Sequence, residues 1–421
     1  MAIRLFNVND EEYFGDNVYL IHRPYILSNP YTHIKDKQTK AMFVVPSREE
    51  AIERYSHYFD VMYGKNIKLS IFGQSHSKAI GVSIDGLPAG IKIDMDKLNK
   101  FMSRRAPGGK FYSTPRKEAD KVEFISGLVD NTTCGAPLCA LIYNTNTKSS
   151  DYNELRDIPR PGHADYSANI KYKGYQDVAG GGHFSGRLTA PLCVVGGICK
   201  QILEKQGIVI AAHISNLGGM QDDRFDMIHV CAKDLEELQT HEFPIINLDI
   251  LDNMKSRVEE VKSQKDSLGG IIECAVIGLK PGIGEPMFDG VENKIASIVF
   301  GIPAIKGIEF GAGFGVADMW GSENNDEFYY DDNIIKTKTN NHGGILGGIT
   351  SGMPLVYRVA IKPTPSIARE QDSVSLKKGE NVKLKIKGRH DPCIVPRAVP
   401  VIEAATAIAL YDLIIDSERS L

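Results

Sequence analysis

His163 lies in a loop that glycine and proline make rigid, IPRPGHADYSANIKY (158–172). The segment has no helical or strand period, and no second His or Cys stands at metal-ligand spacing from His163. Five more stretches combine Gly or Pro with charged or imidazole side chains: FGQSHS (72–77), SRRAPGG (103–109), AGGGHFSGR (179–187), KPTPSI (362–367) and GRHDPCIVPRAVP (388–400). Each loop alone is more often only a turn, but their number in one chain predicts a functional site.

The cations in these loops indicate an anion-binding site. Constrained loops present backbone N–H groups and guanidinium forks that can clamp a multiply charged anion. Arg187 also follows three glycines where the chain enters a predicted helix, and a helix N-terminus favours anions. His76, His163 and Asp391 are groups that can move protons. The cations in or beside the loops are Arg104, Arg105, Arg160, Arg187, Lys362, Arg389 and Arg397.

This set predicts a small substrate with several negative charges and a reaction that transfers protons. A Ser-His-Asp hydrolase is not indicated, because the sequence has no Gly-x-Ser-x-Gly motif. The P-loop signature of nucleotide-binding enzymes is absent as well.

The composition argues against several classes of protein. The 421 residues are 42% hydrophobic and 24% charged, which is typical of a globular protein with two domains or one large domain and an extension. A net charge of −4 leaves no broad basic field for nucleic acid. No run of about 18 apolar residues is evident, so we expect no membrane span. The N-terminus lacks the layout of a signal peptide, and the seven scattered cysteines form no Cys-x-x-Cys, so we expect a cytoplasmic protein with reduced, mostly buried thiols.

Hydrophobic periodicity places the loops between short strands and helices. Alternation over 67–71 and over 79–86 predicts two strands, and one apolar face over 95–105 predicts a helix. Residues 187–206 predict an apolar helix that Gly207 stops, and Pro400 is predicted to open the last helix.

Two further patterns concern the organisation of the chain. The segments IDGLPAGI (84–91) and VIGLKPGI (276–283) echo each other, which indicates either two related halves or only a favourable strand exit. Residues 1–64 differ from the rest, since they are rich in Tyr and Asn and poor in Gly. A capping box at Ser47 and Glu50 predicts a helix over 46–64. We therefore expect an extension of unknown role over 1–64 and a catalytic domain over 65–421.

Together, the loops resemble the chorismate synthase family. The family pattern runs through Gly-Glu-Ser-His-Gly, Arg-Arg-x-Pro-Gly, Arg-Pro-Gly-His-Ala-Asp, a triple-glycine loop, Lys-Pro-Thr-x-Ser and Gly-Arg-His-Asp-Pro-Cys. The segments here read GQSHS, RRAPGG, SGLVDNTTCGAP, SSDY, RPGHADY, GGGHFSGR, GGILGGITSG, KPTPSI and GRHDPC, in the same order over residues 66–415. The resemblance implies an α+β fold, a β-α-β sandwich of antiparallel sheets covered by helices, assembled as a homotetramer.

The resemblance also implies a reaction. The family converts 5-enolpyruvylshikimate 3-phosphate to chorismate by an anti-1,4-elimination of phosphate, a step of the shikimate pathway of aromatic amino acid biosynthesis. Reduced FMN is required although no net redox change occurs, and NADPH takes part only where the enzyme reduces its own flavin. The two carboxylates and the phosphate of this substrate fit the number of arginines found in the loops.

The family roles are carried over residue by residue. His163 resembles the histidine that stabilises and protonates the reduced flavin, His76 the proton donor to the departing phosphate, and Asp391 the acceptor of the flavin N5 proton. The resemblance assigns substrate binding to Ser75, Arg104, Arg105, Arg160, Arg187 and Arg389. It assigns FMN binding to His183, Phe184, Ser185, Ala304, Gly347, Lys362, Pro363, Thr364, Pro365, Ser366 and Arg389.

The sequence departs from the family pattern at five positions. Gln74 and Ser77 replace a common Glu and Gly around His76, and Ala106 stands where a third Arg is common. Ala179 and His183 replace arginines on either side of the triple glycine. Each lost charge-assisted contact is worth about 1.5–3 kcal/mol. Two alternatives therefore stay open: a flavin-dependent lyase for another polyanion, and a flavin- or anion-binding protein without turnover.

Overall fold

The chain divides into two compact units, Met1–Tyr63 and Gly64–Leu421. The computed structural model describes residues 63–420, except 109, 114–117, 119, 146–154 and 387–390. Within 1–62 it describes only the short antiparallel strands β1 (Arg4–Asn7), β2 (Leu20–Ile21), β3 (Ile26–Leu27), β4 (Thr32–Lys35) and β5 (Met42–Phe43). The helix predicted over 46–64 therefore lies outside the described residues, apart from its last two.

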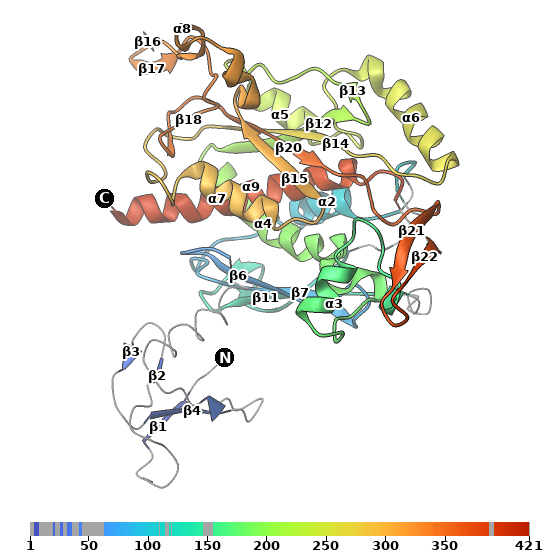
Figure 1. Ribbon diagram of the computed structural model, residues 1–421. Coiled ribbons are helices and arrows are strands. Elements are labelled where there is room, and N and C mark those ends of the chain that lie inside the picture. The colour runs from blue at the N-terminus through green and yellow to red at the C-terminus, as the bar shows by residue number, and fades with distance from the viewer. Residues whose placement is uncertain are drawn as a thin grey trace. The chain divides into compact units, whose positions relative to one another are not determined.

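Two antiparallel sheets form the framework of the second unit (Figure 1). The first has the strand order β6-β7-β11-β8, with β6 (Lys68–Phe72), β7 (Ala79–Asp85), β8 (Val122–Ser126) and β11 (Leu138–Tyr143). The second has the order β13-β12-β14-β20-β15, with β12 (Val209–Leu217), β13 (Met220–Gln221), β14 (Gly270–Ile277), β15 (Ile305–Phe310) and β20 (Leu355–Ile361). The two strands predicted over 67–71 and 79–86 are thus confirmed as β6 and β7.

A layer of helices lies between the sheets (Figure 1). It contains α2 (Met95–Arg105), α4 (Thr189–Glu204), α7 (Val291–Phe300) and α9 (Val395–Ser420). Every residue of α4 from Thr189 to Leu203 is buried, as expected for a helix that is apolar on all sides. In the layer, α4 packs on α9 and on the first sheet, while α9 also packs on the second. This order of layers confirms the predicted β-α-β sandwich and its α+β class.

The start of the last helix differs from the sequence prediction. Helix α9 begins at Val395, so Pro400 lies inside it rather than at its first position. A proline inside a helix removes one backbone hydrogen bond, which is why Pro400 was expected at a start. An 18-residue window of α9 has a mean hydropathy of 1.8, which corrects the expectation that no such apolar run exists. That window is 89% buried in the protein, so α9 serves as the core helix of the sandwich.

A carboxylate of α9 binds the first residues of the second unit. Asp412 accepts hydrogen bonds from the backbone N–H groups of Lys65 (2.9 Å), Asn66 (2.6 Å) and Ile67 (2.8 Å). Asp412 is 2% exposed, so this contact fixes the beginning of β6 against the core.

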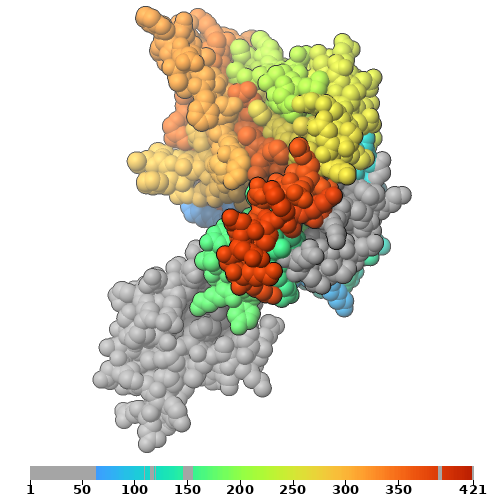
Figure 2. All heavy atoms as spheres, turned by 45° about the vertical axis from the view of Figure 1, so that its right-hand side comes forward, coloured from blue at the N-terminus to red at the C-terminus, as the bar shows by residue number. Residues whose placement is uncertain are grey.

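Shorter helices and strands surround the sandwich. The helices are α3 (Asp165–Lys171), α5 (Ala232–Leu238), α6 (Leu251–Ser263) and α8 (Gly321–Asn324). The strands are β9 (Leu128–Val129), β10 (Thr132–Thr133), β16 (Phe328–Asp331), β17 (Ile334–Thr337), β18 (Ile345–Leu346), β19 (Ile349–Thr350), β21 (Glu370–Ser375) and β22 (Glu380–Lys385). Figure 2 shows the β21–β22 hairpin (orange-red) beside the segment that carries α3 (green), and Ser373 Oγ donates to the Pro159 carbonyl at 2.6 Å.

The internal echo falls at equivalent strand exits. Gly86 and Gly278 follow β7 and β14 with φ of +94° and +84°, and Gly90 and Gly282 have φ of +86° and +98°. Residues with a side chain rarely adopt a positive φ of this size, so both strand exits favour glycine. All seven cysteines are free thiols, of which Cys193, Cys199, Cys274 and Cys393 are buried.

Replacing Gly196 by alanine is expected to destabilise the helix layer. A Cβ on Gly196 of α4 would overlap Cα and Cβ of Ala404 in α9. Overpacking of this kind costs about 1–3 kcal/mol. Denaturant unfolding should show that loss for Gly196→Ala. Gly321→Ala is the matched control, since no described atom lies within 4 Å of its added Cβ. Equal stability of the two variants would contradict this packing.

Candidate active site

The triple-glycine loop lies against two of the predicted catalytic histidines. Gly180, Gly181 and Gly182 all have positive φ, of 62°, 86° and 54°. An added Cβ on Gly180 would lie 2.7 Å from His76 Nε2, and one on Gly181 would lie 3.1 Å from His163 Nε2. The loop thus brings together residues 87 positions apart in the sequence, because glycine alone allows both ring contacts.

The FGQSHS loop is fixed to the same glycines. The Ser75 backbone N–H donates to the Gly182 carbonyl at 2.9 Å, and Ser75 is 2% exposed. Ser77, one of the departures from the family pattern, stabilises the turn from within: its hydroxyl accepts from the Gln74 N–H at 3.0 Å and lies 2.7 Å from the Ala79 carbonyl. The serine therefore has a structural role in shaping the loop that carries His76.

A neighbouring carboxylate orients the His163 ring. His163 Nδ1 lies 2.6 Å from Asp165 Oδ1 and 3.1 Å from Arg160 Nη2. An ionised carboxylate can only accept, so the shorter contact with Asp165 favours a proton on Nδ1 over a bond donated to it by Arg160. Nε2 is then turned toward Gly181. The ring is therefore held with its Nε2 at the glycine loop.

Arg160 holds the Asp165 carboxylate in place and thereby fixes the position of the His163 ring. Its Nε donates to Asp165 Oδ2 at 2.7 Å, its Nη2 to Asp165 Oδ1 at 2.8 Å and its Nη1 to Ser366 Oγ at 3.1 Å. Burial alone would raise the pKa of Asp165, but hydrogen bonds from Arg160 and His163 outweigh it and lower the pKa. The structure places the Arg160 guanidinium on protein groups, and its direct contact with substrate stays a prediction.

The predicted cofactor segment KPTPSI meets the His163 loop. Lys362 Nζ donates to the Gly162 carbonyl, and Pro365 Cβ lies 3.5 Å from the position a Gly162 Cβ would take. Burial, and then the charge of Lys306, lower the pKa of Lys362. The Lys362 N–H donates to the Ala304 carbonyl at 3.0 Å. Ala304, Lys362 to Ser366 and His163 therefore lie together.

Two orphaned atoms mark this region as a site that can receive a ligand. Thr364 Oγ1 and Arg187 Nη2 are buried with no hydrogen-bond partner among the described residues. Buried polar atoms normally have partners, so an unpaired one indicates a role in binding. Thr364 belongs to the predicted FMN set and Arg187 to the predicted substrate set.

Gly347 lies apart from the other predicted cofactor residues. The adjacent Gly348 carbonyl accepts from the Val291 N–H at 2.9 Å, at the first residue of α7, whereas Ala304 follows the last residue of α7. A helix of 10 residues is about 15 Å long. Within one chain, Gly347 is therefore not brought to the His163 loop.

His183, Phe184 and Ser185 leave the glycine loop at the surface. His183 is exposed and stacks on Phe184, with ring centroids 5.3 Å apart and planes at 23°. Ser185 Oγ accepts from the Arg187 N–H at 3.2 Å. The His183 ring thus makes an aromatic contact with Phe184 at the position where the family has an arginine.

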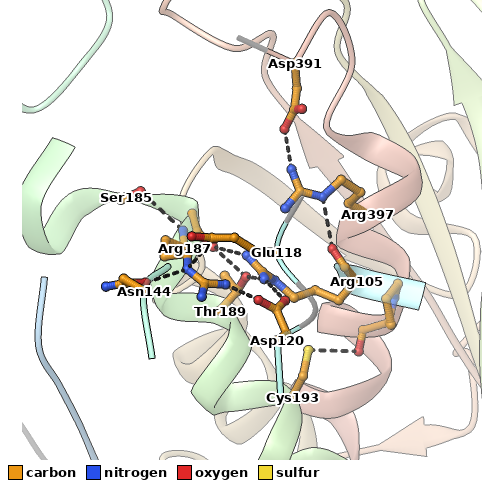
Figure 3. Close-up of polar contacts among 12 residues, drawn as sticks. Arg105, Glu118, Asp120, Asn144, Ser185, Arg187, Thr189, Cys193, Asp391 and Arg397 are labelled. Carbon is orange, nitrogen blue, oxygen red and sulfur yellow. Dashed lines mark hydrogen bonds and ion pairs between the residues drawn. The ribbon is translucent and has the colours of Figure 1, made fainter. Parts of the chain in front are cut away.

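Arg105 and Arg187 share one buried carboxylate (Figure 3). Both guanidinium groups bind Asp120, which is 3% exposed and has a positive φ of 47°. Arg187 Nε also lies 3.0 Å from Asn144 Oδ1 and 3.1 Å from Glu118 Oε2. Burial would raise the pKa of Asp120, yet the two guanidinium charges lower it.

Arg104 is held by a second buried carboxylate, on α9. Its Nη1 and Nη2 each donate to Glu403 at 2.7 Å, and Lys200 Nζ lies 3.0 Å from the same carboxylate. Glu403 is fully buried and also accepts from the Ala212 N–H at 3.2 Å. Burial would raise the pKa of Glu403, but the charges of Arg104 and Lys200 lower it.

Asp391 lies at the entrance of α9 and is bound by Arg397 (Figure 3). Arg389, predicted to bind both substrate and cofactor, falls outside the described residues.

The site analysis from sequence missed the carboxylates that hold the cations. Asp120, Asp165 and Glu403 are buried carboxylates, and the sequence motifs pointed to none of them as a site residue. Glu403 had a usable signal, because it is a lone acid in the apolar run VPVIEAATAIAL. Asp165 stands inside the RPGHADY motif, whereas nothing local distinguishes Asp120.

Comparisons with known proteins identify the class first. A solved crystal structure of a chorismate synthase superposes with a TM-score of 0.66 at 28% identity, covering 84% of this chain and 93% of the other. The fold of this chain is therefore that of a chorismate synthase, a β-α-β sandwich.

The sequence comparisons then give the family. The family model for chorismate synthase matches residues 67–415. The chorismate synthase of Korarchaeum cryptofilum is 43% identical over 85% of this chain and 98% of the relative. That of Thermococcus kodakarensis is 44% identical over 83% and 96%. The chain belongs to the chorismate synthase family, which confirms the predicted resemblance.

Gly181→Ala should impair catalysis more than it impairs folding. The added Cβ would lie 3.1 Å from His163 Nε2, so the ring must shift by a few tenths of an ångström. Since a displacement of about 1 Å can cost roughly 10²-fold in rate, we expect a loss below that size. Gly174→Ala is the matched control, because Gly174 also has a positive φ of 80° but its nearest described atom is Asn169 Oδ1 at 3.6 Å. Steady-state turnover and the melting temperature should be measured for both. If both variants lose turnover equally, the glycine does not act through His163.

Proposed function

We propose that this chain converts 5-enolpyruvylshikimate 3-phosphate to chorismate by eliminating phosphate, as a carbon–oxygen lyase of aromatic amino acid biosynthesis. The observation that carries the proposal is that His76 and His163 lie against consecutive glycines of one loop. The chain also matches the family over nearly its full domain. A binding protein without turnover would not need two oriented imidazoles at this spacing.

The substrate would bind through the arginines of α2 and of the loop before α4. Arg187 Nη2 is the clearest donor, since it is buried without a partner among the described residues. Arg104 and Arg105 are ionised and held in place by Glu403 and Asp120. An anion with two carboxylates and a phosphate fits such a set because each guanidinium can form paired, charge-assisted hydrogen bonds.

The residues around His163 fit reduced FMN. Thr364 Oγ1 has no hydrogen-bond partner in the described part of the chain, and Lys362 supplies a cation two residues before it in the KPTPSI segment. When bound, the reduced flavin would supply electron density to the reacting ring of the substrate. Around it, His163 would hold a proton at Nε2, with Nδ1 fixed by Asp165.

The remaining proton steps would fall to His76 and Asp391. His76 would donate to the departing phosphate, since an imidazolium is favoured beside an anion. Asp391 would accept a proton as the flavin turns over, which a carboxylate bound by Arg397 can do while ionised. NADPH would be used only if the chain reduces its own flavin.

We also propose a cytoplasmic homotetramer. Large apolar side chains are exposed around the β16–β17 hairpin, where Phe314 is 83%, Trp320 77% and Tyr330 77% exposed. A cavity of about 730 Å³ on the same surface is lined by Phe310, Phe328 and other residues. Exposed apolar surface of this extent is typical of a subunit interface. A neighbouring subunit could also bring Gly347 to a cofactor site from which it is separated in its own chain.

The decisive experiment is anaerobic incubation with the phosphorylated substrate and photoreduced FMN. Chorismate should form with reduced FMN and not with oxidised FMN, which should still bind. His76→Ala and His163→Ala should each slow turnover by roughly 10²–10⁴-fold, the usual contribution of a positioned proton donor. His229→Ala serves as the control, since that side chain is 76% exposed and lies outside the site.

Two outcomes would reject the proposal. If no chorismate forms with excess substrate and reduced FMN, the alternatives are a flavin-dependent lyase for another polyanion or a binding protein without turnover. Wild-type turnover in both histidine variants would remove the assigned roles.

A protein that begins at Gly64 should keep its turnover per folded molecule. The family match starts at Ile67, and Asp412 already anchors residues 65–67 within the second unit. Chorismate formation and assembly state should be compared for residues 64–421 and the full chain. A truncated protein that folds and assembles normally but is inactive would place the first unit in the active site.

A further inference from the structure

Arg397 lies between the predicted base Asp391 and the end of α2 (Figure 3). Its Nη1 donates to Asp391 Oδ2, and its Nε donates to the Arg105 carbonyl at 2.9 Å. The Arg397 and Asp391 side chains are only 14% and 10% exposed. One guanidinium therefore joins the predicted proton acceptor to the helix that carries two predicted substrate arginines.

The backbone on both sides of this contact is fixed. Arg397 is the third residue of α9, and its N–H donates to the Ile394 carbonyl at 3.1 Å. Before the helix, the Pro392 carbonyl accepts from the Leu268 N–H at 2.8 Å, and Cys393 is fully buried. The chain between Asp391 and Arg397 thus has little freedom, and the guanidinium adds a charge-assisted contact that restrains the Asp391 carboxylate.

Arg397 also belongs to a cationic region with Arg104. Burial lowers the pKa of Lys110, and the charges of Arg397 and Arg104 lower it further, against the opposing effect of Glu242. Removing Arg397 would therefore change the local field as well as the Asp391 contact, and an experiment must separate the two.

We propose that Arg397 is a positioning residue for the reaction: it orients the Asp391 carboxylate and fixes its place relative to the arginines of α2. The inference rests on the proposed function and adds to it a residue to which the family resemblance assigned no role. A charge-assisted hydrogen bond holds a carboxylate in one geometry, and loss of that geometry slows a proton transfer without removing the substrate contacts.

A double-mutant cycle with Asp391 tests this role. Arg397→Ala should lower kcat by roughly 10²-fold and change KM by less than about 3-fold, since the contact orients a proton acceptor. In an Asp391→Asn background, Arg397→Ala should cause almost no further loss, because the group it orients is already disabled. Arg397→Lys should give an intermediate kcat, as lysine keeps the charge but not both hydrogen bonds.

Added guanidinium supplies a second readout. It should restore part of the kcat of Arg397→Ala and none of that of Asp391→Asn. Arg257→Ala is the control, since Arg257 is 42% exposed and paired with Glu260 on α6. Circular dichroism and binding of oxidised FMN should be unchanged in every variant used. If Arg397→Ala does not fold, the cycle is run with Arg397→Lys.

The outcomes separate this proposal from the proposed function. Independent, multiplicative losses in the two variants, or a loss confined to KM, would overturn the positioning role. Wild-type kcat in a folded Arg397→Ala would overturn it as well. Failure of the wild-type protein to form chorismate with reduced FMN would instead reject the proposed function.

Discussion

Close approach of backbone to imidazole is the constraint on which this site depends. His76 and His163 come from loops far apart in the sequence, and both rings pack against a stretch of chain that has no side chains. The three glycines adopt positive φ, which lets the loop turn tightly enough to present one residue to each ring. A side chain at Gly180 would meet the His76 ring, and one at Gly181 would crowd the His163 ring. The geometry for proton transfer is thus set by missing Cβ atoms as much as by the imidazoles themselves.

Buried carboxylates allow the cations to stay inside the protein. A desolvated guanidinium is costly unless it is paired and hydrogen-bonded. Asp120 serves Arg105 and Arg187, Glu403 serves Arg104, and Asp165 serves Arg160. Each pairing fixes the orientation of its arginine, at the cost of part of its capacity to bind an external anion. Arg187 Nη2 has no hydrogen-bond partner among the described residues, so part of this capacity remains.

The departures from the family pattern have different physical meanings. Ser77 takes part in the turn that presents His76, so the usual glycine is replaced without loss of the loop. His183 is exposed and stacked on Phe184, so its ring makes an aromatic contact where the family has an arginine. Ala106 and Ala179 simply remove charge. Four of the remaining cations are held by buried carboxylates, so this part of the predicted anion site is built from the interior outward.

The sequence by itself determined the family, the strands β6 and β7, the helices α2 and α4, and the loops that carry the histidines. Those features depend on local periodicity and on glycine and proline at fixed spacings, which a linear sequence records. Tertiary structure alone decided that Gly180 and Gly181 each meet a different histidine, that Asp120 bridges two arginines, and that Gly347 lies at the far end of α7. It also placed Pro400 inside α9, because burial of that helix in the core outweighs the lost backbone hydrogen bond. These relations arise when distant segments pack together, and no local pattern encodes which carboxylate will neutralise which cation in the folded core.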